Sequence, residues 1–166
     1  MNEMDSSPIY IDDASGLSPL ELRTKARRIA HREDIGLIVI DYLQLMQGNR
    51  KNNNRVEEVS EISRALKMVA KELNVPVVAL SQLSRAVESR DSKKPQLSDL
   101  RESGSIEQDA DMVMFIHRPG YYEPDNPDLK NITELIIAKH RNGPVGHIEL
   151  YFHPEKLRFM SLDKKH

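Results

Sequence analysis

Three apolar runs in the chain end in side chains that could bind a nucleotide. The side chains are Asp41, Ser81 with Gln82, and His117 with Arg118. An aspartate that follows a buried parallel strand can hold Mg²⁺, directly or through water, as it does in nucleotide-hydrolysing folds. A glutamine at a neighbouring strand end can donate a hydrogen bond to a γ-phosphate. Two simpler explanations stay open, because Asp41 could cap a turn and Gln82 could be a polar residue that leaves a strand.

Lys139 and Arg141 form a second candidate group. If residues 132–141 are extended, side chains two positions apart project to the same face. Two cations that reach out together suit the charge that develops on a transferred phosphoryl group, which is the role of an arginine finger. The alternative is a solvated hairpin end, just before the turn at residues 142–144.

Two stretches, residues 48–55 and 85–94, are basic and contain no aromatic side chain. The arginines in them are Arg50, Arg55, Arg85 and Arg90. Charge without aromatic rings suits contact with a phosphate backbone and little reading of bases. Each stretch could equally be a solvated loop.

These side chains need a sheet and helices to position them, and the apolar pattern predicts an α/β fold. Runs rich in Val and Ile at 36–41, 75–80 and 112–116 predict parallel strands, the first of them buried on both faces. Parallel strands end at one edge of a sheet, so we expect the three polar strand ends to converge.

Other patterns predict the remaining elements. Apolar residues at helical spacing predict helices at 18–31, 56–73 and near 106–109, and Ser18 with Glu21 forms a capping box for the first. We expect a short strand at 8–12, and an antiparallel meander of strands at 132–140, 146–152 and 157–162.

Composition limits the function classes. The 166 residues suffice for one domain with a core, and the net charge of −2 leaves DNA contact to local basic patches. The chain has no cysteine, which excludes disulfides and thiolate metal sites. No apolar run approaches the ~20 residues that span a bilayer, so no membrane association is expected.

Four segments together resemble the C-terminal motor domain of bacterial DnaB-type replicative helicases. They are residues 37–45, 79–85, 98–111 and 138–146, and the RESGSIEQDAD run within 98–111 is highly specific. The resemblance implies a partial RecA-like core, a mostly parallel sheet flanked by helices with a C-terminal antiparallel meander, over residues 8–163. Residues 1–7 would be disordered or an upstream linker, and 164–166 a tail.

The resemblance also implies a role for each matching residue. Asp41 matches the Walker B aspartate of the Mg²⁺ site, and Gln82 the glutamine that couples the γ-phosphate to the DNA loops. Lys139 and Arg141 match the basic pair that a neighbouring subunit presents to ATP. The loop that grips DNA is matched by Arg101, Glu102 and Gly104. The implied partners are single-stranded DNA, further copies in a hexamer, a primase and a helicase loader, all in the cytoplasm.

One expected motif is missing from this sequence. A P-loop needs a glycine followed by Lys and then Ser or Thr, and none of the seven glycines here is followed by Lys. The catalytic glutamate that the resemblance implies after that loop is also missing, so we expect the 166-residue chain alone to hydrolyse no ATP. Without the first strand and helix of a RecA-like core, we also expect the remaining sheet to expose apolar surface. Two rival hypotheses are a non-catalytic helicase-like regulator or decoy and another RecA-type ATPase, although the RESGSIEQDAD run argues against the latter.

Overall fold

The computed structural model describes residues 8–48, 54–103 and 105–162, and for residues 101–103 it describes the backbone alone. The predictions made for residues 1–7, for Arg50 and Gly104 and for the tail at 164–166 therefore lie outside the described residues.

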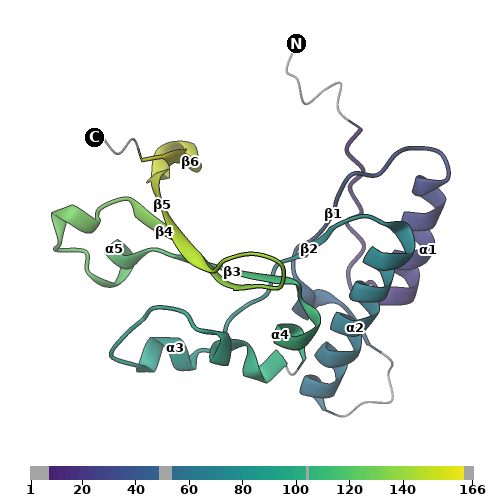
Figure 1. The fold of residues 1–166 in the computed structure, drawn as a ribbon, viewed down its shortest axis with the longest axis horizontal. Coiled ribbons are helices and arrows are strands. Elements are labelled where there is room, and N and C mark those ends of the chain that lie inside the picture. Colours follow the sequence, from purple (N-terminus) through teal and green to yellow (C-terminus); the bar gives the residue numbers. More distant parts are fainter. Residues whose placement is uncertain (1–7, 49–53, 104, 163–166) are drawn as a thin grey trace.

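Six strands form two separate sheets within the described residues. Strands β1 (Ile38–Ile40) and β2 (Val77–Ala79) pair in parallel. An antiparallel sheet in the order β3-β4-β5-β6 contains β3 (Met112–His117), β4 (Ile132–His140), β5 (Gly146–His153) and β6 (Arg158–Ser161). Figure 1 shows β4, β5 and β6 extending away from the body formed by helices α1 and α2. The α/β class and the C-terminal meander are confirmed.

Two longer helices and three short ones accompany the sheets in the same described segments. They are α1 (Pro19–Ala30), α2 (Arg55–Leu73), α3 (Ala86–Ser89), α4 (Ile106–Asp109) and α5 (Pro119–Tyr122). The shorter 3-10 turns are Leu43–Leu45, Leu97–Ser103, Pro127–Leu129 and Pro154–Lys156. Within the described segments, no helix has both the length and the apolar composition needed to cross a bilayer.

Local signals fix where the two long helices begin and end. Ser18 and Glu21 form the predicted reciprocal capping box at the start of α1, which satisfies N–H groups that the helix itself cannot. The side chain of Asn54 accepts the N–H of Val56 at the start of α2. Asn74 ends α2 in the left-handed conformation, with φ of 53°, as helix C-termini commonly do.

Helix α2 supplies the centre of the core. Its buried residues, spaced three or four apart, are Val59, Ile62, Leu66 and Val69. Val59, Ile62 and Leu66 belong to one core cluster with Leu43 and Met46 near the turn after β1, and with Val113 and Phe115 of β3. The side chain of Ile62 is fully buried. One helix thus joins the parallel strand pair to the antiparallel sheet.

The prediction that the strand at 36–41 is buried on both faces is wrong. Ile38 and Ile40 are half-buried, but Val39 is 60% exposed and Val78 of β2 is 38% exposed. Because side chains alternate along a strand, one face of the pair meets the core and the other is open. The expected apolar sheet surface is therefore present, and Leu37 and Leu80 extend it at 51% and 46% exposure.

Two other expectations differ from the structure. Residues 8–12 form no strand, because no described strand pairs with them. They are exposed. The run at 112–116 is a strand, but β3 pairs antiparallel with β4 instead of joining the parallel pair. Its alternating burial, with Val113, Phe115 and His117 inward, reflects a sheet covered on one face.

Candidate functional site

Asp41 and Ser81 leave the parallel strands side by side. The carbonyl of Ile40 accepts the N–H of Leu80 at 2.9 Å, and Leu80 in turn accepts the N–H of Leu43 at 2.9 Å. These bonds continue the pairing beyond the strands and hold the two carboxyl ends at one edge, as predicted. Asp41 is exposed, and in the described segments its carboxylate makes no hydrogen bond or ion pair.

Gln82 occupies the same edge with its side chain exposed and its backbone held. The side chain of Gln44 holds it, since Oε1 accepts the Gln82 N–H at 3.3 Å and Nε2 donates to the Gln82 carbonyl at 3.3 Å. Nε2 also lies 3.2 Å from Oγ of Ser81. The sequence alone indicates no role for Gln44, because its spacing to Gln82 carries no signal before the strands are paired.

The residues at this edge fit a magnesium ion that is bound together with a nucleotide. Among the described residues, no group of three or more His, Cys, Asp or Glu side chains could hold a metal. Mg²⁺ in nucleotide sites is held by one or two carboxylates together with phosphate oxygens and waters. The free carboxylate of Asp41 could supply the single protein ligand that this arrangement needs. One carboxylate is too few for a site in which the protein alone binds the ion.

Lys139 and Arg141 also converge, at a different place. Nζ of Lys139 donates to the carbonyls of Glu107 and Gln108, the latter at 3.5 Å. Nη2 of Arg141 donates to the same Gln108 carbonyl at 3.4 Å. The two cations thus meet over the carboxyl end of α4, where carbonyls carry partial negative charge. In the described part of the chain, no contact joins either cation to Asp41 or Gln82.

Asp111 forms an ion pair with Arg141, one of these two cations. Oδ1 of Asp111 lies 3.1 Å from Nη1 of Arg141, while Oδ2 forms an ion pair with Lys67 of α2. The pKa of the Asp111 carboxyl lies below its ordinary value, first because of the hydrogen bond from Lys67, and further through the charges of Lys67, Arg141 and Lys139. The sequence alone indicates no such role for Asp111, since its partners come from α2 and from the residue that follows β4.

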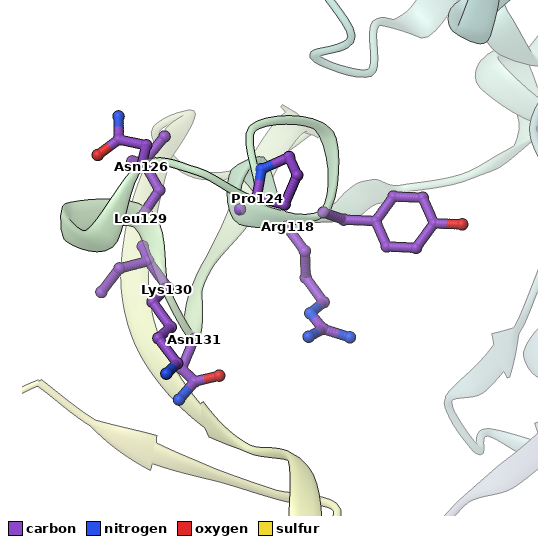
Figure 2. A pocket seen from close by; sticks show the side chains of 9 residues that line it. Arg118, Pro124, Asn126, Leu129, Lys130 and Asn131 are labelled. Atoms are coloured by element: carbon purple, nitrogen blue, oxygen red, sulfur yellow. The ribbon is translucent and has the colours of Figure 1, made fainter.

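The third polar strand end does not join the parallel edge. His117 is buried and stacks on Tyr122 with 5.8 Å between ring centroids. Arg118 places its guanidinium 4.4 Å above the ring of Phe152. Figure 2 shows Arg118 in an open hollow that also includes Asn126, Lys130 and Asn131. The prediction that His117 and Arg118 converge with Asp41 is wrong, because β3 belongs to the other sheet.

The predicted DNA-binding arginines differ in their surroundings. Arg85 is exposed at the start of α3 and makes no ion pair within the described segments. Arg55 pairs with Glu58 and donates to the carbonyl of Gln44 at 2.7 Å. Arg90 donates to the buried carboxylate of Asp99 at 2.9 Å, so the expectation of a solvated loop fails at this residue.

The 3-10 turn Leu97–Ser103 includes Arg101 and Glu102. This turn contacts both α2 and α4. The N–H of Ser105, which follows this turn, donates to Oγ of Ser60 at 3.3 Å. The predicted DNA loop is therefore attached to the same helix that carries Arg55 and Lys67.

A parallel strand pair with an aspartate and a glutamine at its carboxyl edge, packed on helices and followed by an antiparallel meander, is the arrangement of a RecA-like ATPase domain. One solved ATPase domain matches it with a TM-score of 0.91 and 47% identity, over 97% of this chain and 57% of that chain. A DnaB-like replicative helicase, described with its interactions with primase, gives the same TM-score of 0.91 and 47% identity, over 97% and 40% of the two chains.

The sequence comparison is more specific. The family model of the DnaB-like helicase C terminal domain matches residues 1–161. The replicative DNA helicase DnaC of Bacillus subtilis (strain 168) is 54% identical over 166 residues, which cover 99% of this chain and 36% of that protein. The chain therefore belongs to the DnaB-like helicase C-terminal domain family, and it spans about a third of the length of the curated relatives it matches.

Proposed function

We propose that this chain is the C-terminal motor segment of a replicative DNA helicase. Such a motor couples ATP hydrolysis to translocation on single-stranded DNA and to unwinding at the replication fork. The observation that carries the proposal is the presence, in one chain, of two separate half-sites. One is the strand edge with Asp41 and Gln82, and the other is the Lys139–Arg141 pair over α4.

Two half-sites that do not touch within the described part of one chain can meet between neighbouring copies. Asp41 would hold Mg²⁺ and Gln82 would contact the γ-phosphate of one protomer's ATP, while Lys139 and Arg141 would approach from the next protomer. The cations would stabilise the charge that develops on the phosphoryl group during transfer. Such composite sites require an oligomer, and a closed ring of six copies is the form that we propose.

The chain alone would be inactive. Its sequence contains no P-loop, so no backbone cradle or P-loop lysine would hold the triphosphate beside Asp41. We expect the 166-residue chain to show no steady phosphate release. Steady release that Asp41→Ala abolishes would contradict this expectation.

DNA contact would fall on Arg101, Glu102 and Gly104, with Arg50 and Arg85 as further charges. Arg55 and Arg90 give weaker support, because carboxylates already hold their guanidinium groups. In a full-length helicase that contains this segment, Arg101→Ala should weaken single-stranded DNA binding for all sequences alike, with a shallower salt dependence. A primase, a loader and a cytoplasmic setting complete the proposal, and a primase complex is described for one structural relative.

The test of the composite site uses Arg141→Ala in such a full-length helicase. Removing a finger arginine should lower turnover by roughly 10³-fold or more, while ATP still binds. Steady-state hydrolysis and titration with a fluorescent ATP analogue separate the two effects. Arg28→Ala, an exposed arginine at the end of α1, is the matched control and should leave both unchanged. Unchanged turnover in Arg141→Ala would overturn the trans assignment.

A further inference from the structure

Gln44 makes a two-point contact with the backbone of Gln82. Its side-chain oxygen accepts the Gln82 N–H, and its side-chain nitrogen donates to the Gln82 carbonyl, both at 3.3 Å. The same nitrogen reaches Oγ of Ser81 at 3.2 Å. One primary amide therefore fixes the backbone of Gln82, and the Gln82 side chain forms no hydrogen bond in the described part of the chain.

A second set of contacts links Gln44 to the start of α2. Its backbone carbonyl accepts Nη2 of Arg55 at 2.7 Å, and Nη1 of Arg55 forms an ion pair with Glu58. Oε1 of Glu58 accepts the N–H of Gly48 at 2.9 Å. The contacts thus run without a break from Gln82 through Gln44 to the first turn of α2.

Packing does not explain why residue 44 should be a glutamine. The adjacent apolar residues of this turn, Leu43 and Met46, are 3% and 4% exposed and supply its contacts with the core. The Gln44 side chain is half-buried, and each of its hydrogen bonds is directed at Ser81 or Gln82. These contacts require a donor and an acceptor at the end of the residue 44 side chain. A primary amide supplies both, whereas a carboxylate only accepts and a methyl group does neither.

We propose that Gln44 is a positioning residue that holds Gln82 in place for the γ-phosphate and, with Arg55, ties Gln82 to the start of α2. This inference rests on the proposed function, because it assigns Gln44 an effect only through Gln82. Positioning matters here because a displacement of about 1 Å in a catalytic group can cost 10²-fold in rate.

The experiment measures ATP hydrolysis by a full-length helicase that contains this segment, with and without single-stranded DNA. Gln44→Ala should lower kcat by about 10- to 100-fold, with little change in KM or in binding of a fluorescent ATP analogue. Gln44→Glu keeps the size and the acceptor but loses both donations, so it should show the same kcat loss without a cavity. Gln96→Ala, an exposed glutamine whose side chain has no bond within the described residues, should behave like the parent.

The double variant Gln44→Ala with Gln82→Ala separates an effect of Gln44 through Gln82 from an independent effect on the fold. If Gln44 acts through Gln82, then Gln44→Ala should add little to the kcat loss of Gln82→Ala, because residues that act as a unit are not additive. Independent, multiplicative losses would overturn the inference. A normal kcat in Gln44→Ala and Gln44→Glu, with Gln82→Ala impaired, would overturn it and leave the proposed function intact. A normal kcat in Gln82→Ala would overturn both the inference and the role proposed for Gln82.

Arg55→Ala tests the second half of the contact chain. Like Gln44→Ala, it should lower kcat. Affinity for single-stranded DNA should change less than about 2-fold, because an arginine that only positions Gln44 neutralises no DNA phosphate. Weakened DNA binding with unchanged kcat would overturn this part and would return Arg55 to the set of DNA contacts.

Discussion

Arg141 forms an ion pair with Asp111 of its own chain, with 3.1 Å between Nη1 and Oδ1. The backbone N–H of Arg141 also donates to the Asp111 carbonyl at 2.8 Å. Asp111 therefore fixes both the backbone and the guanidinium of the proposed finger. Lys67 holds the other carboxylate oxygen, so the orientation of the finger depends on helix α2.

Asp111→Asn should modestly reduce ATP turnover by a full-length protein that contains this segment, if the proposed function holds. The side chains of Asp111 and Arg141 are 57% and 51% exposed, and an exposed ion pair contributes only ~0.2–1 kcal/mol. That range corresponds to a loss in kcat of about 1.5- to 5-fold, with ATP binding unchanged. Asp125→Asn, which changes an exposed carboxylate between α5 and the 3-10 turn Pro127–Leu129, is the control. A loss as large as that of Arg141→Ala would show that Asp111 does more than orient the arginine.

Ile62→Ala should destabilise the chain far more than Val39→Thr. Ile62 is 0% exposed at the centre of the core, and truncation to Ala removes buried surface and leaves a cavity, at a cost of about 2–5 kcal/mol. Val39 is 60% exposed on the open sheet face, so Val39→Thr should change stability by less than ~0.5 kcal/mol. Urea unfolding followed by circular dichroism measures both. Similar losses in the two variants would mean that the open face is covered in solution.

Stability should fall as the pH drops below the ordinary pKa of His117. Burial lowers the pKa of His117 from 6.5, with Lys94 adding to the effect and Glu134 opposing it. Between the lowered folded pKa and 6.5, the unfolded chain binds the proton more readily, so acidification in that window favours unfolding.

His117→Phe should remove this part of the pH dependence. Urea midpoints measured from pH 7.5 down to about pH 5 would show a shallower decline than in the parent. Gln96→Ala, which changes an exposed side chain that does not titrate, should keep the parental slope. An unchanged slope in His117→Phe would show that other groups carry the acid sensitivity.

Local patterns predicted the elements whose signals are contained within a few residues. The capping box of Ser18 and Glu21, the apolar spacing of α2 and the strand at Ile132–His140 all appear where the sequence places them. Lys139 lies near the end of the extended strand β4 and Arg141 directly follows it, so the nearness of these two cations is also local. Specific motifs gave the family, since a run such as RESGSIEQDAD identifies relatives without any knowledge of its contacts.

Contacts between distant segments could not be predicted in this way. The 112–116 run looks like any buried strand, and only its pairing with β4 moves His117 and Arg118 away from the parallel edge. Arg90 looks solvated in a polar stretch until Asp99 folds against it. Gln44 and Asp111 gain roles only when β2 and α2 bring Gln82 and Lys67 to them.

The sequence by itself determined the family, the two long helices, the strands from residue 38 onward and the residue types at the two proposed half-sites. The tertiary structure decided which groups meet and which remain free, because hydrogen bonds and ion pairs depend on distances of a few ångströms between segments far apart in the chain. Asp41 and Gln82 thus lie at one strand edge. Lys139 and Arg141 lie over α4, where carbonyls of α4 accept from Lys139 and Asp111 holds Arg141.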